Sequence, residues 1–266
     1  MYPLARIDEY RIPTREEVYV LDIIPLTSGP ATISSDQKLS LFNPLSLKAG
    51  PTLNLVTNHG NITCARAFDA DSSVVCTAGE NGTVSIWDLR QDARQAGVAQ
   101  FTTGSTDGLV NICDTRITDE DEVIIQTFNH DSSIHHAAFL NDTEVYAISH
   151  DEKLALYDIA EGYEKGAATT DFGDMRGVLG CQYIANIFAK ANGAGAVIGA
   201  GAHEQQAFEL IHLTKGETWA LDRGNSVGLP GAHSEEIVRS FCFYDEAQMV
   251  FSAGEDGFIK AWRPNA

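Results

Sequence analysis

The chain has 266 residues, 44% of them hydrophobic and 9% aromatic, so it holds enough apolar material for a core and is not a disordered chain. Its formal net charge of −19 at pH 7 repels phosphate backbones and anionic lipid, which argues against direct nucleic-acid or membrane-surface binding and favours basic partners. Five widely spaced cysteines without a C-x-x-C pair indicate neither a disulfide framework nor a zinc ribbon, and they fit a reducing compartment. The charged N-terminal segment and the lack of an apolar span predict an intracellular protein, nuclear or cytoplasmic, without membrane contact.

Short alternating runs of apolar and polar residues predict strands along the whole chain, and helical periodicity is almost absent. In chain order the runs lie at residues 4–12, 18–26, 52–56, 62–68, 123–128, 134–140 and 237–243. Between them, five similar segments each predict a strand, a tight turn and a second strand. They lie at residues 34–43, 77–88, 103–114, 149–158 and 252–263. Three of the turns contain Asn-Gly or Asp-Gly, the pairs that supply the positive φ angles of two-residue hairpins.

Four short strands recurring every 40 or so residues are typical of propeller blades and not of βαβ units. The segments resemble the WD40 repeat family, whose name-giving signature stands here as Ile86-Trp87-Asp88, and the resemblance covers nearly the whole chain. It implies a single all-β domain over residues 1–266, a WD40-type β-propeller. It also implies a non-enzymatic scaffold for protein–protein interaction. This functional step is an analogy, because a fold alone does not supply a function.

The spacing of the third strands predicts an irregularity after residue 90. Trp87 and Cys113, which close two successive third strands, are 26 residues apart, whereas the other intervals span 44 to 54 residues. We therefore expect about six blades, one incomplete, of an ancestral seven, with an irregular junction at residues 91–103. A deletion of about 60 residues relative to the family and a six-bladed ring with one incomplete blade both fit this spacing. Residues 4–12 should supply the outer strand of the last blade, because the chain stops one strand short after Trp262.

Two sets of polar side chains predict hydrogen-bond networks inside blades. An indole N–H only donates, a carboxylate only accepts, and a hydroxyl and a neutral imidazole do both, so a chain from Trp through Ser or Thr and His to Asp satisfies every member. The family pattern places such a chain beneath the blade surface, where it is structural and not catalytic. The candidate residues are His59, Thr77, Asn81 and Trp87 in one blade, and His233, Ser252, Asp256 and Trp262 in the last.

Two other patterns resemble chemical sites but are better explained by packing. The glycine-rich residues 193–199 lack the helix start of a dinucleotide-binding motif and predict a turn between strands. His135 and His136 fall on opposite faces of one predicted strand, so they cannot chelate one ion together with His130 and His150. No nucleophile elbow or phosphate loop occurs. We therefore expect no enzyme activity, no cofactor and no metal.

Two segments are candidates for partner binding. The acidic run Asp119, Glu120, Asp121 and Glu122 is either a solvated loop or a dock for basic protein segments, so escort of a basic client such as a histone or ribosomal protein is an alternative function. Trp87, Asp88 and Arg90 resemble the box by which many WD40 proteins dock on the adaptor of cullin-RING ubiquitin ligases. That resemblance implies a substrate receptor as the other alternative. Asn81 departs from the box, in which Asp is usual.

Overall fold

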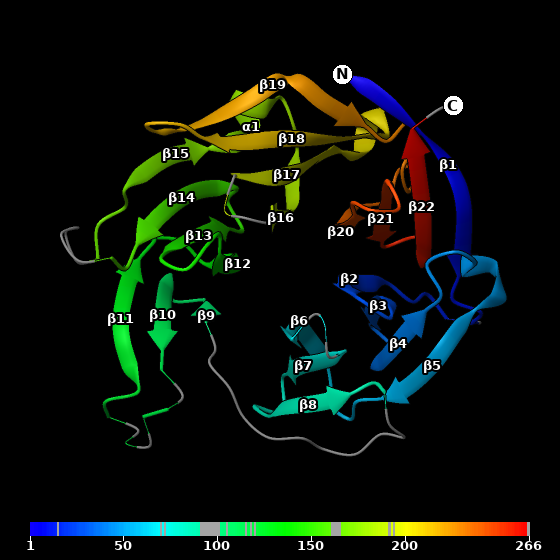
Figure 1. The fold of residues 1–266 in the computed structure, drawn as a ribbon, viewed down its shortest axis with the longest axis horizontal. Helices are drawn as coiled ribbons and strands as arrows, with labels where there is room; N and C mark the ends of the chain where they lie inside the picture. The colour runs from blue at the N-terminus through cyan, green and yellow to red at the C-terminus, as the bar shows by residue number, and fades with distance from the viewer. Residues whose placement is uncertain are drawn as a thin grey trace. The chain divides into compact units, whose positions relative to one another are not determined.

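The computed structural model describes residues 1–14, 16–69, 71, 73–90, 102–104, 106–114, 116–117, 119, 121–160, 166–190, 193 and 195–264. The described chain consists almost entirely of short antiparallel strands, as the alternating pattern predicts (Figure 1). Its single described α-helix, α1 (Met175–Leu179), has five residues, and two 3-10 turns lie at Leu47–Ala49 and His203–Gln205. No helix in this part of the chain is long and apolar enough to cross a membrane.

The chain divides into two compact units. The first comprises Met1–Gly97, Gly201–Leu210 and Ser226–Ala266, and the second comprises Val98–Ala200 and Ile211–Asn225. The prediction of one domain over residues 1–266 stays a prediction.

The first unit contains three sheets built from hairpins. One sheet has the order β2-β3-β4-β5, with strands Val20–Leu26, Gly29–Ser34, Lys38–Phe42 and Pro51–Val56. The next has the order β6-β7-β8, with strands Ile62–Asp69, Val74–Gly79 and Val84–Asp88. The third contains β20 (Val238–Tyr244), β21 (Met249–Gly254) and β22 (Phe258–Pro264).

The N-terminal strand pairs with the third sheet on one side and, in parallel, with residues 227–228 on the other. β1 (Tyr2–Arg11) runs antiparallel along β22, from Leu4 opposite Pro264 to Arg11 opposite Phe258, and is bulged between Arg6 and Asp8 (Figure 1). The turn that leads into β22 requires a glycine: Gly257 has φ +74°, and a Cβ there would lie 2.7 Å from the carbonyl oxygen of Val18.

The second unit repeats the same construction. A three-stranded sheet has the order β11-β10-β9, with strands Ile124–Asn129, Leu109–Cys113 and Thr102–Gly104. A four-stranded sheet follows, of β12 (Ile134–Phe139), β13 (Glu144–Ser149), β14 (Lys153–Asp158) and β15 (Thr170–Asp174). The last four strands are β16 (Tyr183–Ala189), β17 (Gly195–Ala202), β18 (Ala207–Lys215) and β19 (Trp219–Gly228), and the ends of the last three belong to the first unit.

The predicted all-β fold is confirmed, including third strands that carry Phe42, Trp87, Cys113, Tyr157, Ile211 and Trp262. Around the short interval the structure adds a detail. Within the described residues both β6–β8 and β9–β11 are three-stranded. Residues 102–104 pair with β10, so the hairpin predicted at residues 103–114 is formed. The rest of the predicted junction, residues 91–101, lies outside the described residues.

Buried polar side chains tie neighbouring sheets within each unit. In the first unit Asp22, which is 8% exposed on β2, accepts from Ser240 Oγ at 2.7 Å and from Arg66 Nη1 at 3.0 Å. Its carboxylate therefore joins β2 to β20 and β6. Burial raises the pKa of Asp22, and the nearby Arg66 guanidinium offsets part of that rise.

The second unit has an equivalent tie at Glu144 on β13. This carboxylate accepts from Trp219 Nε1 at 2.8 Å and from Lys215 Nζ at 2.6 Å, so it joins β13 to β18 and β19. Burial opposes its ionisation, but the hydrogen bonds from Lys215 and Trp219 prevail and lower the pKa of Glu144.

Replacing Asp22 tests the tie in the first unit. We expect Asp22→Ala to lower the free energy of unfolding by about 1–3 kcal/mol, because it removes the buried hydrogen bond from Ser240 and the one from Arg66. Denaturant titration measures the change, with the exposed Asp245→Ala as a matched control that should stay within about 0.5 kcal/mol of the wild type. Equal effects of the two substitutions would contradict the tie.

Candidate functional site

The last sheet contains the whole predicted hydrogen-bond network. Trp262 Nε1 donates to Ser252 Oγ at 2.9 Å, and the same oxygen lies 2.9 Å from His233 Nε2. His233 Nδ1 lies 2.6 Å from Asp256 Oδ1, and Lys260 Nζ donates to Asp256 Oδ2 at 2.9 Å. His233 and Ser252 are fully buried. The network therefore fixes the loop before β20 and the turn before β22 against one another.

The second predicted network is also assembled, but its last link is longer. Trp87 Nε1 donates to Thr77 Oγ1 at 2.7 Å, and Thr77 Oγ1 lies 2.7 Å from His59 Nε2. His59 Nδ1 is 3.3 Å from Asn81 Oδ1, against 2.6 Å for the equivalent link to Asp256. A neutral amide is a weaker acceptor than a carboxylate, which accounts for the longer distance.

The clustered histidines serve the strands around them. His130 Nδ1 lies 2.9 Å from the Tyr157 hydroxyl, and its Nε2 lies 3.1 Å from the Lys153 carbonyl oxygen. His136 Nδ1 is 3.2 Å from the Tyr146 hydroxyl. Among the described residues, no group of three or more His, Cys, Asp and Glu side chains could hold a metal ion.

The glycine-rich segment differs in part from its prediction. Gly193 has the positive φ of a turn residue, +62°, but Gly195–Ala202 is the buried strand β17 and not part of the turn. Small residues suit this strand because a Cβ on Gly195 would lie 2.4 Å from the Leu213 carbonyl oxygen. The segment is therefore an interior strand.

The box of Trp87, Asp88 and Arg90 closes β8 with a bidentate ion pair. Arg90 Nε and Nη2 lie 2.8 and 2.7 Å from the two carboxylate oxygens of Asp88, and 55% of the Arg90 side chain is exposed. Hydrogen bonds from Arg90 lower the pKa of Asp88 to about 2. The same Asp-x-Arg clamp recurs at Asp114–Arg116 and Asp174–Arg176, in each case at the end of a strand.

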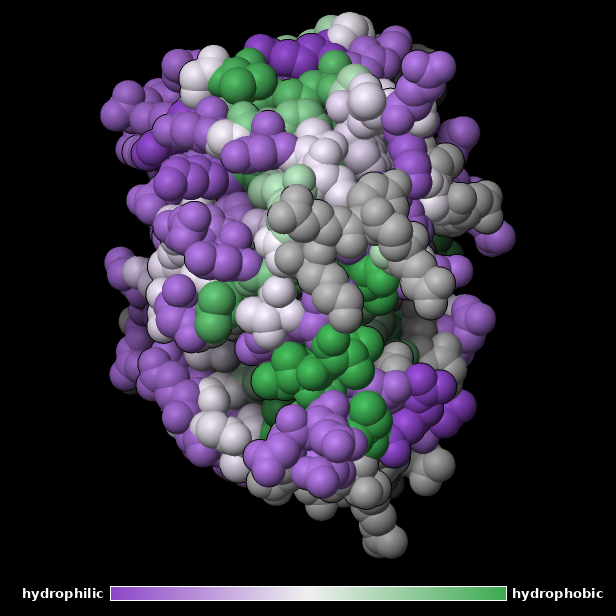
Figure 2. All heavy atoms as spheres, turned by 90° about the vertical axis from the view of Figure 1, so that its left-hand side faces the viewer, coloured by the Kyte–Doolittle hydropathy of each residue, from purple (hydrophilic) through white to green (hydrophobic). Residues whose placement is uncertain are grey.

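The acidic run is an exposed loop after β10. Asp119, Asp121 and Glu122 are exposed, and the backbone N–H of Asp121 donates to Asp119 Oδ1 at 3.1 Å. Glu120 lies outside the described residues. Near this loop, β11 exposes Ile124 and Ile125 by 48% and 50%. The side of the molecule that carries β11 faces the viewer in Figure 2, where hydrophobic side chains lie among predominantly hydrophilic ones.

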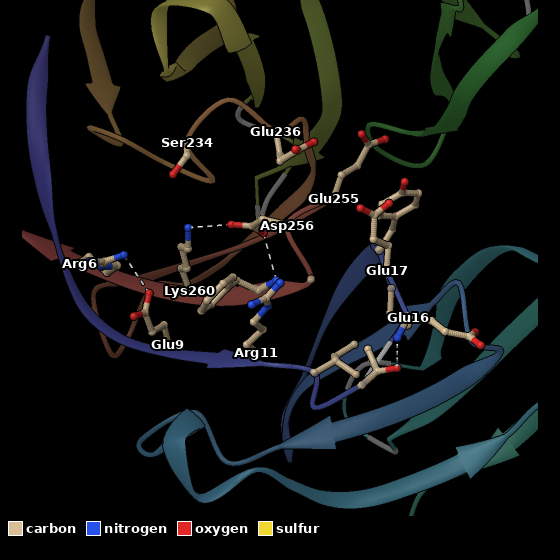
Figure 3. Close-up of a pocket in the computed structure, with 16 residues that line it drawn as sticks. Arg6, Glu9, Arg11, Glu16, Glu17, Ser234, Glu236, Glu255, Asp256 and Lys260 are labelled. Atoms are coloured by element: carbon tan, nitrogen blue, oxygen red, sulfur yellow. Dashed lines mark hydrogen bonds and ion pairs between the residues drawn. The ribbon is translucent and has the colours of Figure 1, made fainter.

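The structure also reveals a polar cavity of about 530 Å³ that no sequence pattern singled out. It lies in the first unit, where β1, the segment 12–19, the loop 234–236 and the turn 255–258 meet, and Figure 3 shows its charged lining. Its acidic residues come from positions far apart in the sequence. The available signal was the pair of charged stretches at residues 15–17 and 235–236, each just before a strand that opens a sheet.

Comparison with known proteins agrees with these observations. The family model "WD domain, G-beta repeat" matches residues 50–88 and 224–263, which contain β5–β8 and most of β19–β22. An uncharacterized WD repeat-containing protein of Saccharomyces cerevisiae is 32% identical over 235 residues, covering 80% of this chain and 56% of the relative. Another from Schizosaccharomyces pombe is 30% identical over 172 residues, covering 60% and 50%. The chain thus spans about half the length of these relatives.

The fold is also shared with a solved structure. A chain in the crystal structure of the mitotic checkpoint complex superposes with a TM-score of 0.59 and 14% identity, covering 94% of this chain and 76% of that one. At this identity the likeness shows the fold alone. Together with the family match, it confirms the predicted fold class, the WD40-type β-propeller.

The network around Asp256 predicts an acid-dependent loss of stability. Burial opposes its ionisation, but the bonds from His233 and Lys260 hold the pKa of Asp256 at about 2, below the usual value of 3.8. A depressed carboxyl pKa contributes stability above the unfolded value, and that contribution is lost as pH falls towards 2. Between pH 5 and pH 2 we expect the free energy of unfolding of the wild type to fall by about 1–2 kcal/mol more than that of Asp256→Asn.

Denaturant titrations at several pH values measure this slope. The exposed Asp245→Asn is the control and should retain the wild-type slope. Parallel pH profiles for the wild type and Asp256→Asn would show that the carboxylate is not held in its charged form by the network.

Proposed function

We propose that this chain, a WD40-repeat protein with the β-propeller fold, is a non-enzymatic scaffold that binds other proteins through the loops between its strands. The observation that carries the proposal is that the polar residues which resemble a catalytic set are hydrogen-bonded to one another inside the blades. His59, Thr77, His233, Ser252 and Asp256 are all bonded within their own blades, where they hold loops in place. These residues therefore have a structural role, and the loops that they hold in place form the surface available to a partner.

Fixed loops favour binding because the conformational entropy of ordering them is already lost before a partner arrives. The network connects His233, in the loop before β20, with Asp256 in a tight turn. A rigid scaffold carrying exposed loops is the usual arrangement of interaction modules. The acidic character of the chain favours basic partners among those it could bind.

A substrate receptor of a cullin-RING ubiquitin ligase is the second candidate. It is favoured by Arg90, which closes β8 with more than half of its side chain exposed. Asp88 fixes the position of the Arg90 guanidinium, which therefore offers a preorganised planar donor to an adaptor. The recurrence of the clamp at Arg116, without a preceding Trp, provides a control within the same chain.

Escort of a basic client, such as a histone or ribosomal protein, is the third candidate. It is favoured by the exposed Asp119, Asp121 and Glu122, none of which forms an ion pair with another described residue. Binding of this kind is dominated by charge, so it weakens steeply as salt rises.

We further infer that, within the family, the chain is most similar to WD repeat-containing protein 89, on residues 104–111, 119–123 and 129–135. The short interval between third strands supports the inference that about one blade is missing after residue 90. A single domain over residues 1–266 and an intracellular location, nuclear or cytoplasmic, complete the proposal.

Affinity capture tests the scaffold. We expect the tagged full chain to retain a defined set of proteins from cell extract, and to lose that set in Ser252→Ala, because this change leaves the buried indole N–H of Trp262 unpaired and loosens the adjoining loops. Quantitative mass spectrometry measures retention at about 0.1 M and about 0.5 M salt, and the escort function predicts a steep loss at the higher salt. Retention no greater than that of the tag alone would refute the scaffold.

Paired arginine substitutions test the ligase candidate. We expect Arg90→Ala to abolish co-purification of the ligase adaptor, whereas Arg116→Ala, which removes an equivalent clamp from β10, should leave it unchanged. Immunoblotting of captured adaptor measures both. Unchanged recovery with Arg90→Ala rejects the receptor function.

A further inference from the structure

The cavity in the first unit has the size of a ligand site. Its volume of about 530 Å³ falls within the range of about 300–1,000 Å³ of known small-ligand pockets. One wall is formed by β1 and β22, and the others by the segment that enters β2, the loop before β20 and the turn before β22. All of these elements belong to one compact unit.

The floor of the cavity is rigid. Lys260 lines it and is only 3% exposed, and its Nζ is held at 2.9 Å from Asp256, the last member of the Trp262 network. The Lys260 ammonium also lies 5.0 Å from the centre of the Phe258 ring, and the Arg11 guanidinium lies 5.5 Å from the same centre. The shape of the cavity is therefore set by packed strands and hydrogen bonds before any ligand arrives.

Most charges in the lining already have a partner. Arg6 pairs with Glu9 at 2.8 Å, Lys260 pairs with Asp256, and Glu255 pairs with Arg239 behind the wall. Each of these pairs carries no net charge, so the paired residues attract no ligand by charge alone.

The remaining charges are predominantly negative. Glu16, Glu17 and Glu236 are exposed and form no ion pair with another described residue, whereas Arg11 is the one cation of the described lining without an ion pair. Figure 3 shows Glu17, Glu236 and Glu255 on one side of the cavity and Arg6, Arg11 and Lys260 on the other, with Glu16 pointing away. Glu17 and Glu236 thus present two uncompensated carboxylates beside a rigid, partly aromatic wall.

We propose that this cavity is a docking site for a lysine or arginine side chain carried by an extended basic segment of a partner protein. The inference rests on the proposed scaffold function and names the chemistry of one of its partners. The cation would sit between Glu17 and Glu236, and the Tyr19 and Phe258 rings in the lining would contact its aliphatic part.

Two other occupants fit less well. An anion would meet the uncompensated carboxylates, while the two best-placed cations, Arg6 and Lys260, are already neutralised. A bare metal ion needs a convergent set of ligands, and the described part of the chain contains no such set of three. A partner's cationic side chain requires only the carboxylates present and the depth to hold its stem.

A peptide titration tests the site. The probe is an acetylated, amidated peptide, Ala-Arg-Ala-Lys-Ala-Arg, titrated into the full chain by isothermal calorimetry and ¹⁵N NMR. We expect backbone signals of residues 12–19, 234–237 and 255–258 to shift. We expect Glu17→Gln combined with Glu236→Gln to weaken binding about five- to tenfold, and the same peptide with glutamine in place of its basic residues not to bind.

A matched double variant separates the cavity from general charge attraction. Glu235→Gln combined with Glu246→Gln removes the same charge from exposed carboxylates in the same unit, one of them next to Glu236 but outside the cavity. It should weaken binding less than twofold. Equal weakening by both double variants, or unshifted signals around the cavity, overturns the site. If in that case the full chain still captures partner proteins from cell extract, only the site is refuted. If the full chain captures no partner protein, the scaffold function itself is refuted.

Discussion

An indole N–H inside a sheet can donate a hydrogen bond but cannot accept one, and the last sheet of this protein is organised around that constraint. The Trp262 indole donates to the Ser252 hydroxyl, which is itself bonded to His233. The other ring nitrogen of His233 is bonded to Asp256. Because every member is buried or nearly so, each link depends on the next. The chain of bonds starts on a strand and ends in a turn, so it fixes the loops at the edge of the sheet as well as the sheet itself.

The features of this fold that its sequence predicts are those that follow from a local rule. Strand alternation and the Asn-Gly and Asp-Gly turns predict the hairpins, and the donor and acceptor capacities of Trp, Ser, Thr, His and Asp predict both networks, in which every expected pair is within hydrogen-bonding distance. The same rules predict the hairpin at residues 103–114, which the structure contains, with residues 102–104 paired to β10. Residues 195–199 are predicted as part of a turn, because glycine favours turns locally. In the structure they belong to β17, where the close approach of the Leu213 carbonyl oxygen requires a glycine at position 195.

The contacts between sheets lay beyond sequence reasoning altogether. Asp22 meets Ser240 across 218 positions, and Glu144 meets Trp219 across 75. An acidic residue within an apolar run looks like an outward-facing position until the neighbouring sheet brings donors to it. The cavity is a similar case, since its carboxylates come from three separate segments. For Arg90 the motif was visible, but its bidentate pairing with Asp88 and the repetition of that clamp elsewhere became apparent only in the structure.

The pairing of β1 with β22 constrains how the protein is made. Arg11 faces Phe258, so β1 has to wait for a partner strand that is translated about 250 residues later. At typical elongation rates of about 5–20 residues per second, that delay is roughly 10–50 seconds. Throughout it, a ten-residue strand that mixes apolar and charged side chains has no native neighbour on its β22 side. Its arginines and acidic residues discourage pairing with other chains during this time, as charged edge strands generally do. The composition of this strand thus serves biosynthesis as well as the finished sheet.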